Sequence, residues 1–81
     1  MTIRKIANFY FNNYPKININ VEMWGGLRGR YTLYTKKSFE VELNGWLDEE
    51  VIIMHFDTHA HNYADGTISK RDYPVLYICY K

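Results

Sequence analysis

The chain has 81 residues, enough for a single α+β domain over residues 1–81 with a modest hydrophobic core. Apolar residues make up 47% and charged residues 23%, which excludes a disordered tail. Ten basic and nine acidic residues leave a net charge of +1, so the chain lacks the overall positive charge of a non-specific nucleic-acid binder.

The first predicted element is a helix at residues 3–13. Thr2 is a suitable N-cap, apolar residues recur at three- and four-residue spacing, and Pro15 ends the pattern. Residues 17–23 then alternate between apolar and polar side chains, which predicts a strand with one buried and one solvated face. A glycine-rich turn at residues 25–29 leads to a second strand that starts at Tyr31.

Alternation continues in the middle of the chain. Phe39, Val41 and Leu43 predict a third strand, followed by an Asn44-Gly45 turn signal and a wider connection through Trp46. The stretch 51–61 is strongly apolar at its start and holds all three histidines, and we expect it to be a central strand with Ile52 and Met54 in the core.

The strand predicted at residues 75–80 is apolar on both faces. It therefore lies either inside the sheet beside residues 51–56 or at an edge that recruits a second copy. Both positions predict a homodimer or a docking surface near this strand. Because short connections favour antiparallel neighbours, the expected fold is one N-terminal helix packed on a four- to five-stranded antiparallel, meander-like sheet.

His55, Asp57, His59 and His61 share one face of the strand and form the only metal-binding pattern that we identify. Imidazole and carboxylate groups are suitable ligands for zinc. Neighbours on one strand face are about 6.6 Å apart, so two of them can share an ion and a third ligand has to come from elsewhere. The candidates are Asp65, Asp72, Glu40 and Glu42. The alternatives are a small hydrolase that uses this strand, or an ordinary polar pair followed by a loop without metal.

Fourteen aromatic residues, namely four Phe, eight Tyr and two Trp, exceed what so small a core needs. Without a nucleophile elbow, a phosphate-binding glycine loop or a cysteine pair, they favour a non-enzymatic protein-binding module without a cofactor. The expected binding residues are Trp24, Arg28, Arg30, Tyr34, Glu40, Glu42, Trp46 and Tyr63. The alternative is that these rings close the ends of the sheet as a second small core.

The specific hypothesis is an inhibitor or accessory protein of a phage or mobile element that blocks a larger host protein, such as a defence nuclease. It rests on a composition rich in Tyr, Ile, Asn and Lys. The single Cys79 excludes an intramolecular disulfide, and residues 1–16 lack the pattern of a signal peptide. We therefore expect a cytoplasmic protein with no membrane contact.

A single-stranded nucleic-acid binder is the remaining alternative. Arg28, Arg30, Lys36 and Lys37 lie close in sequence to Tyr34, and such a group can contact phosphates while an aromatic ring stacks on a base. The near-neutral net charge makes this hypothesis secondary to protein binding.

Overall fold

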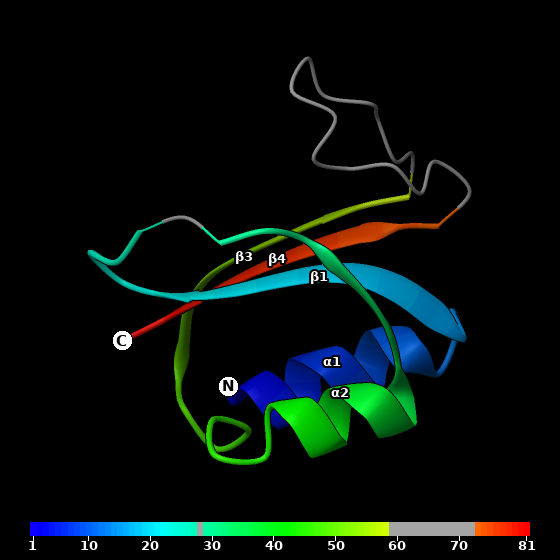
Figure 1. Cartoon of the computed structure of the whole chain (residues 1–81), viewed down its shortest axis with the longest axis horizontal. Coiled ribbons are helices and arrows are strands. Elements are labelled where there is room, and N and C mark those ends of the chain that lie inside the picture. Colours follow the sequence, from blue (N-terminus) through cyan, green and yellow to red (C-terminus); the bar gives the residue numbers. More distant parts are fainter. Residues whose placement is uncertain (28, 59–72) are drawn as a thin grey trace.

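The computed structural model of the chain describes residues 1–27, 29–58 and 73–81. Two helices lie side by side against one face of a four-stranded sheet (Figure 1), which confirms the predicted α+β class. The elements are, in chain order, α1 (Ile3–Phe11), β1 (Lys16–Met23), β2 (Thr32–Thr35), α2 (Lys36–Glu42), β3 (Val51–Asp57) and β4 (Val75–Tyr80).

The strand order is β2-β1-β4-β3, and the sheet is mixed. β2 is antiparallel to β1, and β3 is antiparallel to β4, but the two central strands β1 and β4 are parallel. The expectation of a wholly antiparallel meander is therefore wrong. Strands β2 and β3, which are consecutive in the chain, lie at opposite edges of the sheet and are joined through α2, because a helical crossover can span the sheet where a tight turn cannot.

Helix α1 begins where the sequence predicts and ends two residues earlier. The hydroxyl oxygen Oγ1 of Thr2 accepts a hydrogen bond from the backbone N–H of Lys5 at 3.3 Å, which is a standard N-cap. The connection before β3 satisfies two more N–H groups of the first turn through the carbonyls of Leu47 and Glu49. The buried side of the helix carries Ile3, Ile6, Ala7 and Phe11.

Helix α2 stands where the sequence predicts a strand, so that prediction is wrong. A capping box starts the helix: Thr35 Oγ1 accepts from Ser38 N–H at 3.2 Å, and Ser38 Oγ accepts from Thr35 N–H at 2.9 Å. Helical geometry turns Phe39 into the core and leaves Val41 71% exposed, whereas a strand would place both on one face.

The core lies between the helices and the sheet. Ile17 and Ile19 of β1 and Leu76 and Ile78 of β4 meet α1 and the ring of Phe39 there. The opposite face of β1 was expected to be solvated, but its Asn18 and Asn20 are buried. The amide of Asn20 donates to the carbonyl of Gly29 at 3.3 Å, so the connection between β1 and β2 folds back onto this face.

The apolar stretch that contains β3 is an edge strand and not the expected centre of the sheet. Ile52 and Met54, expected in the core, are about half exposed. β4 takes the inner position, paired with β1 on one side and β3 on the other, which is the first of its two predicted positions. Its residues are buried or half-buried on both faces, so β4 uses the better-covered position.

Candidate functional site

The outer side of β3 is one of the two edges of the described sheet. The N–H of Val51 donates to the carbonyl of Met1 at 2.8 Å, so the N-terminal residues cover the start of the strand. The register shifts between Val51 and Ile53, where a bulge introduces Ile52. Beyond this bulge no described strand pairs with the outer edge of β3.

The side chains of β3 do little to protect this edge. Exposed sheet edges are usually guarded by lysine, proline or inward-pointing charges. From Val51 to Phe56 the sequence contains neither proline nor a charged residue when His55 is neutral. Ile52, Ile53 and Met54 are each between 41% and 46% exposed. The edge therefore combines unpaired backbone with apolar side chains.

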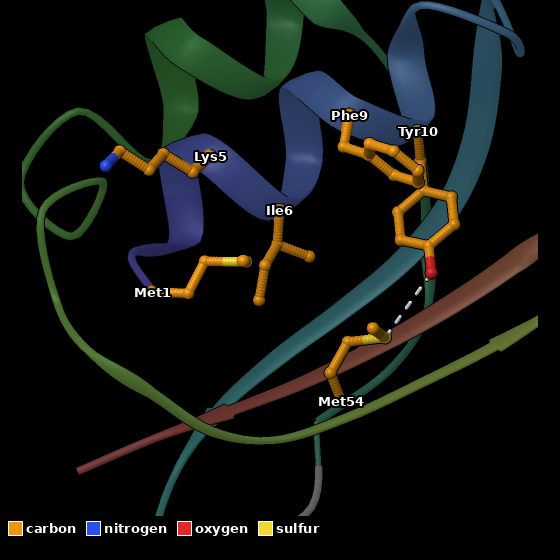
Figure 2. A pocket seen from close by; sticks show the side chains of 6 residues that line it. All are labelled: Met1, Lys5, Ile6, Phe9, Tyr10 and Met54. Atoms are coloured by element: carbon orange, nitrogen blue, oxygen red, sulfur yellow. Dashed lines mark hydrogen bonds between the residues drawn. The ribbon is translucent and has the colours of Figure 1, made fainter.

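An apolar pocket of about 290 Å³ lies between α1 and β3. We call it the α1–β3 slot; its lining residues are Met1, Lys5, Ile6, Phe9, Tyr10 and Met54. Figure 2 shows the α1 side chains above the strand, with Met54 reaching up from β3 toward Tyr10. The slot thus adjoins the strand whose outer edge is unpaired.

Aromatic contacts hold the slot in shape. The ring of Tyr10 stacks on the ring of Phe56 with centroids 4.0 Å apart, and its hydroxyl donates to Met54 Sδ at 3.7 Å (Figure 2). Phe9 meets Tyr10 edge to face at 5.1 Å and is still 63% exposed. Two β3 side chains are therefore held by Tyr10, while most of the Phe9 ring stays exposed.

The charges around the slot are few. Arg4, on the same helix, contacts Asp48 at 3.4 Å. Lys5 lines the slot with its aliphatic stem, and its ammonium group forms no ion pair with any residue that the structure describes. Met1, another lining residue, pairs its N-terminal ammonium with Glu50 at 2.7 Å. The slot therefore presents an apolar surface on which Lys5 is the lining cation without an ion pair among the described residues.

The binding residues expected from sequence lie on several elements of the described structure. Trp24 and Arg30 are exposed in the connection between β1 and β2, and Trp46 is exposed after α2. Glu40 and Glu42 lie on α2. Arg28 and Tyr63 lie outside the described residues. Of the described members, Tyr34 and Glu42 are joined by a hydrogen bond. A common binding surface for the whole set stays a prediction.

Tyr34 contributes to the core more than to a surface. Its ring meets the buried ring of Phe39 edge to face at 5.2 Å. Burial is the main cause that raises the pKa of the Tyr34 hydroxyl, and a hydrogen bond to Glu42 raises it further. Tyr34 therefore packs at the margin of the main core, and the contact does not define a second small core.

Of the four metal ligands proposed on this strand, the structure describes two. His55 and Asp57 lie on the face of β3 that points away from the helices, opposite Tyr77 and Val75 of β4. His59 and His61 lie outside the described residues, as do Asp65 and Asp72. Within residues 1–27, 29–58 and 73–81, no three His, Cys, Asp or Glu side chains come together. Zinc binding stays a prediction.

A polar network on the face away from the helices was not predicted from the sequence. The carboxylate of Glu22 accepts hydrogen bonds from the hydroxyl of Tyr77 and, at 3.3 Å, from the N–H of Gly29. The hydrogen bond to Glu22 is the main cause that raises the pKa of the Tyr77 hydroxyl, and burial raises it further. This network joins β1, β4 and the connection after β1, so its role is structural.

Sequence reasoning also missed the slot. Phe9 carried the available signal, because it lies outside the stripe formed by Ile3, Ile6 and Tyr10. A large apolar residue on the polar side of a helix indicates a second contact. Its neighbour Met54 could not be assigned to the same site until the strand order was known.

Searches against protein-family models, curated proteins and solved structures find no match to this chain. Neither described helix has the length and apolar character needed to cross a bilayer. The α1–β3 slot and the edge beside it are the features of the described structure that bear on function.

Proposed function

We propose that this chain is a non-enzymatic protein-binding module and that it binds its partner along the β3 edge and the α1–β3 slot. The observation that carries the proposal is the direct contact between an unguarded sheet edge and an apolar pocket. Each element supplies a different part of recognition, since a free edge offers backbone hydrogen bonds and a pocket selects a side chain.

The chemistry of the lining supports binding over catalysis. The slot presents mainly aliphatic and aromatic surface, in which Tyr10 is engaged with Phe56 and Met54. Lys5 stands at the rim, with no carboxylate or imidazole among the lining residues to act as its acid or base partner. Such a surface gains free energy by being covered.

The finer sequence hypotheses stay predictions. An inhibitor of a host protein, encoded by a phage or mobile element, is one form that a protein-binding module can take, and a cytoplasmic location is consistent with it. No contact among the described residues favours zinc or single-stranded nucleic acid over a protein partner. A homodimer through β4 requires contact at a face, because both edges of β4 are already paired.

The proposal can be tested with peptides displayed on phage and selected against the immobilised protein. Affinities of the enriched peptides are then measured for wild type, Phe9→Asp and the control Val41→Asp, which alters an equally apolar and exposed helix position. We expect Phe9→Asp to weaken binding at least about tenfold and Val41→Asp to change it less than about twofold. Failure to enrich any peptide, or equal losses in both variants, would contradict the proposal.

A further inference from the structure

We propose that the partner enters this site as an extended segment of another protein that adds to β3 as a fifth strand. It places one apolar side chain in the α1–β3 slot and one carboxylate beside Lys5. This inference rests on the proposed function and specifies the chemistry of its partner.

The backbone of β3 favours a strand as the incoming element. Beyond the bulge at Ile52, β3 follows a regular antiparallel register with β4, from Ile53 opposite Cys79 to Asp57 opposite Val75. A regular edge strand presents alternate N–H and C=O groups outward, and only an extended chain can pair with them in sequence. A helical partner would leave these groups without protein hydrogen bonds.

The size and position of the slot favour a side chain as its occupant. Its volume of about 290 Å³ lies at the lower limit of small-molecule pockets, which begin at about 300 Å³. On a strand added to β3, every second side chain would point to the helix-covered side, as Met54 and Phe56 already do. One of those side chains would enter the slot below Phe9.

The spacing along α1 predicts a second contact. Lys5 and Phe9 are four residues apart, a rise of about 6 Å along the helix. Side chains on the same face of a strand repeat at about 6.6 Å. A segment with its apolar residue at Phe9 therefore brings its next same-face residue near Lys5. Because Lys5 has no ion-pair partner among the described residues, a carboxylate is the complementary group.

A second copy of this chain fits the site less well. The β3 side chains that a copy would bring to the slot are Met54 and Phe56, and Tyr10 of the same copy already engages both. Neither side chain is free to enter the slot of the other molecule. Antiparallel pairing through β3 would also place the Lys5 ammonium groups of both copies on the same side of one sheet.

The strand geometry is tested by methylating the backbone nitrogens of the tightest selected peptide, one at a time. A strand added to β3 directs only alternate N–H groups toward β3, so losses of about tenfold are expected at every second position. The intervening positions should change affinity less than twofold. Losses without this two-residue period would overturn strand addition and leave the proposed protein-binding function intact.

Charge reversal tests the contact with Lys5. Lys5→Glu should weaken binding of a peptide that carries the carboxylate about tenfold, and replacing that carboxylate with lysine should restore binding to the variant. Lys37→Glu, on exposed α2, is the matched control. Equal effects of both variants would overturn this contact. A dimer of the free protein that Phe9→Asp dissociates would instead identify a second copy as the partner and overturn the inference.

Discussion

The two edges of the sheet are built differently. β2 has four residues, begins and ends with threonine, and continues directly into the capped helix α2, which packs against it. β3 has seven residues, carries no charge before Asp57 and exposes three large apolar side chains. Short edge strands and adjoining helices limit edge pairing. We call the β2 side of the sheet, where a helix adjoins a short strand, the closed side, and the β3 side the open side.

The same contrast extends to the helices above the edges. On the β2 side, Phe39 fills the space between α2 and the sheet and meets Tyr34 and Phe11. On the β3 side, α1 leaves a pocket of about 290 Å³. Both sides use aromatic residues, so the number of rings does not separate a core from a binding surface. The two are separated by whether other side chains cover the rings.

The largest expected effect is a loss of stability when a buried ring is removed from the β2 side of the core. Phe39→Ala removes a buried ring between α2 and β2, and large-to-small changes of this kind reduce the free energy of unfolding by about 3–5 kcal/mol. Urea unfolding of this variant and of Phe39→Leu, which keeps most of the volume, measures the loss. Val41→Ala should change stability by less than about 0.5 kcal/mol, and a similar loss at both sites would contradict the assigned helix face.

Tyr77→Phe tests the network between the two edges. Removing the hydroxyl that donates to Glu22 should lower the free energy of unfolding by about 1–3 kcal/mol near neutral pH. The folded pKa of Tyr77 is raised above its ordinary value of 10.0, so its contribution is complete below pH 10 and is lost as the pH rises further. Wild-type stability should therefore approach that of the variant above pH 10. A constant difference across this range would contradict the sign of the shift.

A smaller effect is expected at the start of α2. Thr35→Ala removes the cap that turns the end of β2 into a helix, and such changes reduce stability by about 1 kcal/mol. Thr35→Ser keeps the hydroxyl and should recover most of the loss. Thermal unfolding measures both, and peptide affinity should stay unchanged, because this cap lies on the closed side.

The smallest effect on stability is expected at the open side. Phe9 is largely exposed, so Phe9→Asp should change the free energy of unfolding by no more than about 0.5 kcal/mol while it weakens peptide binding. Chemical denaturation, run beside the affinity measurement, separates the two effects. A loss above about 2 kcal/mol would mean that Phe9 belongs to the core and that the slot is a packing defect.

Local patterns predicted much of the fold. Helix α1, strand β1 and the two-faced apolar strand β4 follow directly from residue spacing and from the Pro15 and Thr2 signals. α2 was missed because Phe39, Val41 and Leu43 fit the two-residue period of a strand, whereas only Phe39 and Leu43 share a face of a helix. The capping pair Thr35 and Ser38, three residues apart, was the competing signal.

The candidate site could not be predicted in the same way. Both β3 and β4 are apolar, and only the parallel pairing of β4 with β1, far apart in the sequence, decides which of them is the edge. Because β3 is an edge strand, Met54 lines the wall of the pocket, and Phe9 lies at its rim. Residue type, such as the histidine pattern or the number of aromatic rings, can be read from a sequence, whereas exposure depends on the assembled sheet.

The most direct test of the contrast between the edges is amide hydrogen exchange, followed by NMR with and without the tightest selected peptide. We expect binding to slow exchange at alternate residues of β3 between Ile53 and Asp57, and to leave β2 unchanged. Slower exchange in β2, or in the exposed connection at Trp24 and Leu27 with no change in β3, would contradict the assignment of the β3 edge as the binding site.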